Sequence, residues 1–145
     1  MNTCNIVKII LLMCFCLWST ILCAIEKDSA DEFHNKIEIA QKNKSFVFIA
    51  VVDNEAPSIH LINDLENKTL RFADAHVVSI VDYSNKEIVE KLLGFNIRND
   101  KGQYVTPTWI LINYVNWKVY KYFGYCGADK AGPDLKKIMD SSFEE

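Results

Sequence analysis

Few side chains in this chain of 145 residues have the types and spacing needed for chemistry. Its three histidines, His34, His60 and His76, do not have the spacing of a metal-binding set. No serine stands in a Gly-x-Ser-x-Gly context, and neither a phosphate-binding glycine loop nor an HExxH pair occurs. The sequence therefore predicts no catalytic residue, metal site or cofactor, and we expect the histidines on the surface.

An apolar leader contains most of the cysteines. Residues 1–24 carry one charge, Lys8, followed by an apolar run to Cys23, and the sequence turns polar from Glu26 onwards. This pattern is typical of a secretory signal peptide and predicts cleavage after Ala24, with residues 25–145 as one exported domain, periplasmic or secreted. An uncleaved membrane anchor is the alternative, because Leu22 is larger than signal peptidase prefers and the run nearly spans a bilayer.

Loss of the leader changes both the cysteine count and the charge. It removes Cys4, Cys14, Cys16 and Cys23, so Cys126 remains as a free thiol without an internal disulfide partner. That thiol is interpreted as a buried small side chain or, alternatively, as the site of a disulfide-linked dimer. Because one basic residue, Lys8, is lost, the formal net charge changes from −3 to −4. Nucleic-acid binders present a basic face, so no nucleic-acid partner is expected.

Hydrophobic periodicity predicts an order of elements. The continuous apolar run SFVFIAVV at 45–52 is typical of a strand buried on both faces of a sheet, and a strand joined to the next through a helix is usually parallel to it. Pro133 suits the first turn of the last helix. The expected elements are a helix at 29–42, a strand at 45–52, a helix at 57–73, a strand at 76–81, a helix at 85–95, an antiparallel hairpin of strands 108–112 and 118–123, and a helix at 134–142.

This order and two motifs resemble the thioredoxin-like superfamily. The buried strand FVFIAVV runs into a helix after Asp53, and Val105-Thr106-Pro107-Thr108 precedes the apolar strand WILI as a cis-proline loop does in that family. Gly124 stands where such proteins often have a glycine. The resemblance implies an α/β three-layer sandwich with a central mixed four-stranded sheet flanked by helices, and a cis Thr106–Pro107 bond. The alternative is another small α/β sandwich in which Pro107 is trans.

The departure from the family concerns its chemistry. The four positions of the family's Cys-x-x-Cys motif correspond here to Asp53, Asn54, Glu55 and Ala56. Disulfide exchange needs a thiolate at the helix start and a second thiol to resolve the mixed disulfide. We therefore expect no disulfide exchange at these positions, and we interpret Asp53 as the helix N-cap rather than as part of a metal or substrate site with Glu55.

What the resemblance leaves is a binding surface. In the family, the loop before the cis-proline pairs with an extended peptide, which implies a polypeptide partner at Thr106 and Pro107, with Trp109 as a further candidate. The leading hypothesis is an exported, redox-inactive protein that binds a polypeptide or assists folding. The alternative is a thiol-disulfide oxidoreductase that uses Cys126 or a redox partner. Asn43 and Asn67 begin N-glycosylation acceptor patterns, which apply only if the source is eukaryotic.

Overall fold

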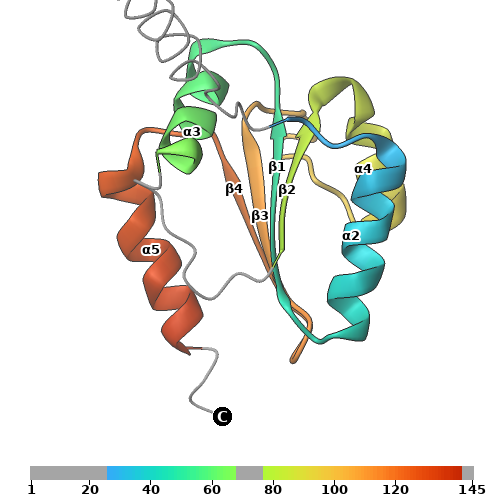
Figure 1. Cartoon of the computed structure of the whole chain (residues 1–145). Helices are drawn as coiled ribbons and strands as arrows, with labels where there is room; N and C mark the ends of the chain where they lie inside the picture. The colour runs from blue at the N-terminus through green and yellow to red at the C-terminus, as the bar shows by residue number, and fades with distance from the viewer. Residues whose placement is uncertain (1–25, 68–76, 142–145) are drawn as a thin grey trace, which may run out of the picture.

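Four strands form a mixed sheet with helices on both faces in the computed structural model, which describes residues 26–67 and 77–141 (Figure 1). The sheet has the order β2-β1-β3-β4; β1 and β2 are parallel, and the other two pairs are antiparallel. The predicted α/β three-layer sandwich is therefore confirmed. The elements are α2 (Ala30–Lys42), β1 (Phe46–Val52), α3 (Ala56–Glu66), β2 (Val77–Asp82), the 3-10 turn η1 (Tyr83–Asn85), α4 (Lys86–Leu93), β3 (Thr108–Asn113), β4 (Lys118–Phe123) and α5 (Ala128–Ser141).

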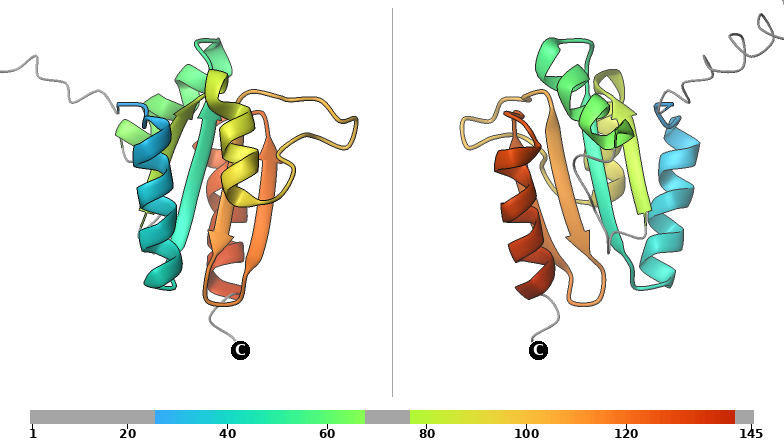
Figure 2. Two further views of the ribbon diagram at one scale, coloured as in Figure 1. Left: turned by 90° about the vertical axis from the view of Figure 1, so that its right-hand side faces the viewer. Right: turned by 60° about the vertical axis from the view of Figure 1, so that its left-hand side comes forward.

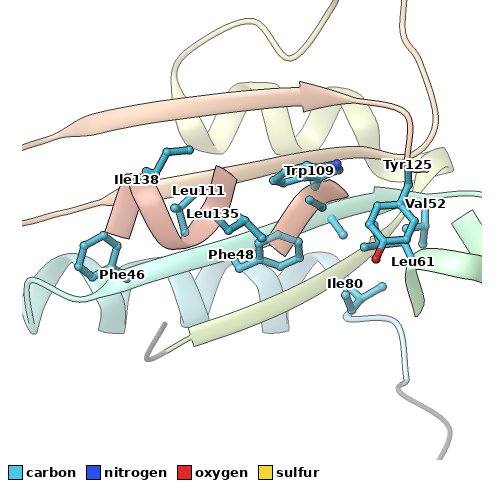
Figure 3. Close-up of a cluster of buried hydrophobic side chains, with 12 residues drawn as sticks. Phe46, Phe48, Val52, Leu61, Ile80, Trp109, Leu111, Tyr125, Leu135 and Ile138 are labelled. Atoms are coloured by element: carbon cyan, nitrogen blue, oxygen red, sulfur yellow. The ribbon is translucent and has the colours of Figure 1, made fainter. Parts of the chain in front are cut away.

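The central strand β1 contributes to two cores. All seven of its residues are buried, as the continuous apolar run predicts. Side chains alternate along a strand, so Phe48 and Val52 pack under α3 and α5 on one face (Figure 3). Ile49 and Val51 pack on the other face, which α2 and α4 cover (Figure 2). Strand β1 thus contributes side chains to the hydrophobic cores on both faces of the sheet.

The helix ends follow local rules. Ser29 caps α2 in a capping box with Glu32, whose side chain accepts a hydrogen bond from the Ser29 backbone N–H at 2.8 Å. Gly94 ends α4 in the left-handed region at a φ of +75°. The start of α2 agrees with the predicted helix at 29–42, whereas α4 ends at Leu93, two residues before the predicted end at 95.

The start of the last helix differs from the prediction. Helix α5 begins at Ala128, so Pro133 lies inside the helix rather than in its first position. The apolar stripe explains the difference, because Ala131 is buried on the same helical face as Leu135 and Ile138. The stripe therefore begins two residues before the proline, and packing of this first part of α5 outweighs the hydrogen bond that Pro133 cannot donate.

Several expectations concern residues outside the described ranges. They are the leader of residues 1–24, His76, the end of the helix predicted at 57–73, most of the acceptor pattern at Asn67, and the side chain of Met139. Within residues 26–67 and 77–141, no helix has the length and apolar character needed to cross a bilayer.

Candidate functional site

Two distant segments meet at one end of the sheet. Asp53 directly follows β1, and Thr106 and Pro107 directly precede β3. Because β3 runs antiparallel to β1, the start of β3 lies beside the end of β1, where Val51 pairs with Thr108. The motif positions and the proline loop are therefore neighbours in space. This end of the sheet, with Asp53, Asn54, Glu55, Thr106 and Pro107, is called the loop site below.

Asp53 is the most connected residue of the loop site. Its Oδ2 accepts a hydrogen bond from the Thr106 hydroxyl, and its Oδ1 accepts one from the Glu55 backbone N–H at 3.0 Å. The Asp53 backbone N–H donates to the hydroxyl of the buried Ser58 at 3.2 Å. Partial burial raises the pKa of Asp53. Hydrogen bonds from Thr106, Ser58 and Glu55 together lower it by more, so the pKa lies below its usual value. The carboxylate is therefore held in its charged form.

The proposed N-cap role of Asp53 is wrong in its detail. Helix α3 begins at Ala56, and its N-cap is Glu55, whose side chain makes no capping hydrogen bond. Asp53 stands two residues before that cap and satisfies the Glu55 N–H, which lies outside the helix. The carboxylate thus shapes the turn into α3 and joins it to the proline loop.

A lysine from the N-terminal segment also reaches this end of the sheet. Lys27 Nζ donates to Asp82 Oδ2 at 2.7 Å and to Asn54 Oδ1 at 3.3 Å. Hydrogen bonds from Lys27 and from the Ser84 backbone N–H and hydroxyl lower the pKa of Asp82 to about 2. Lys27, Asp82 and Ser58 are functional-site neighbours that no sequence motif singles out. The sequence does contain a pattern that points to Asp82. Asp53 and Asp82 stand at the ends of two parallel strands, and the ends of parallel strands lie at the same edge of a sheet.

Hydrogen bonds from Gly124 and Thr108 hold the proline loop. The Thr106–Pro107 peptide bond is cis, and the Pro107 carbonyl accepts a hydrogen bond from the Gly124 N–H at 2.7 Å. The Thr108 hydroxyl donates to the Val105 carbonyl at 2.7 Å. Pro107 is buried, whereas Val105 and Thr106 are half-buried. Groups before the proline, rather than the proline ring, are therefore the ones that solvent reaches.

Trp109 does not lie on the surface. Its side chain is 4% exposed and stacks on Tyr122, with ring centroids 4.0 Å apart. Its indole N–H donates to the Gly124 carbonyl at 3.1 Å. Trp109 thus belongs to the core under α5, and its expected direct contact with a polypeptide does not fit this placement. Trp109 instead holds Gly124, whose backbone N–H donates a hydrogen bond to the Pro107 carbonyl of the proline loop.

Cys126 lies between β4 and the start of α5. It is exposed, contrary to the interpretation as a buried small side chain, and no hydrogen bond of the described residues joins it to Asp53. The preceding residue, Tyr125, donates its hydroxyl to Asp64 Oδ2 at 2.7 Å, and His60 Nε2 lies 3.3 Å from the same oxygen. His34 and His60 are both about half-exposed, as expected, and no group of metal-ligating side chains occurs among the described residues.

Comparison with known proteins finds solved structures of similar fold. The crystal structure of chloroplastic thioredoxin z is similar, with a TM-score of 0.53 and 16% sequence identity over 81% of this chain and 96% of that one. No family model matches the sequence. No curated protein matches it either. The similarity establishes a thioredoxin-like fold for the described domain.

Proposed function

We propose that this domain is an exported, thioredoxin-like protein that binds a polypeptide at the loop site and does not exchange disulfides there. The observation that carries the proposal is the hydrogen bond between the Thr106 hydroxyl and the Asp53 carboxylate. It places a charged carboxylate where the fold's chemistry requires a thiolate nucleophile. The solved thioredoxin z is described as defining a type-specific target recognition, and recognition without exchange is the role proposed for this chain.

The exposed groups of the loop site favour binding of an extended segment. Asn54 and Glu55 are exposed, and Asp53 and Thr106 are half-buried beside them. Backbone groups of an exposed loop at a strand start can pair with an added peptide strand, whereas side chains on either side select its residues. Binding at this place needs neither a metal nor a cofactor.

A reduction assay tests the absence of exchange chemistry. The purified protein should not accelerate reduction of insulin by dithiothreitol. The double variant Asp53→Cys with Ala56→Cys should gain activity, because the start of α3 lowers the pKa of a thiol placed there. Glu55 beside that thiol should keep the gain small. Insulin reduction by the unmodified protein that is lost in Cys126→Ser would contradict the proposal.

A second measurement tests polypeptide binding. Reduced, carboxymethylated α-lactalbumin serves as an unfolded probe in an NMR titration. Amide resonances of Asn54, Glu55 and Thr106 should shift, and Thr106→Arg, which fills the loop site with a long side chain, should abolish those shifts. Lys101→Arg, in an exposed turn outside the loop site, is the control. Binding that leaves the loop-site amides unchanged would place the binding surface elsewhere.

The exposed Cys126 supports the alternative function. An accessible thiol can form a mixed disulfide with a redox partner or link two copies of the chain. Non-reducing electrophoresis of the protein and of Cys126→Ser separates these cases from the leading proposal. Intact mass tests export: a mature chain beginning at Ile25 supports cleavage of the leader, and retention of residues 1–24 supports the membrane anchor.

A further inference from the structure

The two edge strands of the sheet, β2 and β4, differ in how far other segments cover their outer backbone groups. At the β2 edge, the Asp28 backbone N–H donates to the Ile80 carbonyl at 2.6 Å, and Lys36 Nζ donates to the Val78 carbonyl at 3.0 Å. Asp28 also forms an isolated bridge with Val81. The N-terminal segment and α2 therefore occupy the outer groups of β2, which protects this edge against pairing with another strand.

The β4 edge has no such cover. Within the described part of the chain, the backbone groups of residues 119–123 hydrogen-bond only to β3. In an antiparallel pair every second residue directs its N–H and C=O toward the neighbouring strand, so the alternate groups of β4 face away from the sheet. Figure 2 shows β4 at the margin of the sheet, beside β3 alone. This is the geometry to which an added strand binds.

Exposed apolar side chains gather on the same hairpin. Of the eight large hydrophobic residues that are exposed in the described ranges, four lie between residues 115 and 123: Val115, Trp117, Val119 and Phe123. Val119 and Phe123 pair across the ladder with Ile112 and Thr108, so they lie on the face of α2 and α4. A stripe of this kind on an open edge marks an interaction surface rather than scattered surface residues.

One positive charge divides the apolar stripe. Lys121 lies between Val119 and Phe123 on the same face, and its Nζ donates to the Asn96 carbonyl at 2.8 Å. No carboxylate of the described residues lies within salt-bridge distance of that Nζ. The carbonyl orients the ammonium group without neutralising it. The complementary surface therefore carries a negative charge flanked by apolar groups.

We propose that β4 binds an extended polypeptide of a partner protein as a fifth strand, with an acidic residue opposite Lys121 and apolar residues two positions before and after it. A second copy of this chain fits less well. Antiparallel self-pairing that sets Val119 opposite Phe123 also sets Lys121 opposite Lys121, and like charges directly opposite each other are destabilising. This surface adjoins the loop site at Phe123, which pairs with Thr108, but it shares no residue with that site and does not depend on the function proposed there.

Two matched peptides test the proposal. The probes are acetyl-Thr-Val-Thr-Glu-Thr-Phe-Thr-amide and the same peptide with lysine in place of glutamate, each titrated into the purified protein and followed by NMR. Amide resonances of residues 119–123 should shift, and the glutamate peptide should bind about 5-fold more tightly. Lys121→Glu should reverse this preference. Lys101→Glu, an exposed substitution with the same change in net charge, should leave it unaltered.

Four results would overturn the proposal. Equal affinity for the two peptides, or an unchanged preference in Lys121→Glu, would remove the assigned role of the charge. Shifts confined to Asn54, Glu55 and Thr106 would place peptide binding at the loop site alone. Shifts of the β4 amides on concentrating the protein without peptide, together with a doubled mass in light scattering, would assign the edge to a second copy of the chain.

Discussion

At the loop site, the Asp53 carboxylate makes structural contacts. A cysteine at a helix start is useful because its thiolate can leave its hydrogen bonds to attack a disulfide. The Asp53 carboxylate instead keeps partners on both sides of the site, the Glu55 N–H at the start of α3 and the Thr106 hydroxyl of the proline loop. Asp53 thus joins the turn before α3 to the proline loop.

The charge of Asp53 makes the strength of this link depend on pH. Thr106→Val removes the hydroxyl and should lower the free energy of unfolding by about 1–2 kcal/mol at pH 7. The pKa of Asp53 is lowered on folding, so its contribution is present above its ordinary pKa of 3.8 and is lost as the pH falls through the lower value of the folded state. The effect of Thr106→Val should therefore shrink in acid, as urea unfolding at about pH 7 and about pH 2.5 would measure.

Thr108→Val is the matched control for this experiment. Thr108 is the first residue of β3, two positions after Thr106, and its hydroxyl donates to the neutral carbonyl of Val105. Its loss should destabilise the protein to the same extent at both pH values, because the acceptor does not titrate. If both variants show the same pH dependence, the Asp53 carboxylate is not the acceptor that Thr106 stabilises.

Among the elements, the entry into α5 is the most constrained connection. Gly127 has a φ of +116°, and a Cβ at this position would lie 2.8 Å from Asp129 Oδ1 and 3.6 Å from His60 Cε1. Gly94, at the end of α4, has a φ of +75° and open space around it. The two glycines differ in backbone φ as well as in the space around them, so both differences raise the cost of a side chain at Gly127.

Alanine at each glycine measures these two costs. Gly94→Ala should lower the free energy of unfolding by about 1–2 kcal/mol, through the left-handed backbone alone. Gly127→Ala should cost about 2–3 kcal/mol, because it adds the clash with Asp129 to the backbone strain. Equal losses in the two variants, measured by chemical denaturation, would contradict an added cost at Gly127 from its backbone conformation and from Asp129.

The sequence predicts those elements whose burial has one dominant pattern. Strand β1 is a continuous apolar run because both of its faces are covered, and its position is therefore visible in the sequence. The start of α5 is not, since Pro133 suggests a first turn while the buried stripe begins at Ala131. Local propensity and packing conflict there, and packing determines the boundary.

Contacts of the loop site are harder to predict than its location. The strand order brings Asp53 and the proline loop together, and the resemblance already indicates this. The bond between Asp53 and Thr106, however, joins residues 53 positions apart, and Lys27 reaches Asp82 across 55 positions. No local pattern encodes such side-chain pairs, because each depends on the register of strands that other residues determine.

At the scale of the whole molecule, β1 and β3 connect two cores that lie on opposite faces of the sheet. Phe48 and Leu111 face α3 and α5, whereas Ile49 and Ile110 face α2 and α4. Neither layer can lose its packing without exposing one face of the shared strands. The domain should therefore unfold as one cooperative unit, although its helices on opposite faces do not contact each other through the sheet.

Trp109 provides a probe for this cooperativity, since it is buried in the core under α5 and stacks on Tyr122. Ile37→Ala, in the opposite core, should lower the free energy of unfolding by about 2–4 kcal/mol. In a protein whose other tryptophans, Trp18 and Trp117, are replaced by phenylalanine, Trp109 fluorescence and far-UV circular dichroism should shift to lower urea by the same amount. Leu135→Ala, beside Trp109, is the comparison and should move both signals equally. A Trp109 transition that stays in place while the circular dichroism shifts would mean that the two layers unfold separately, and that β1 couples them only weakly.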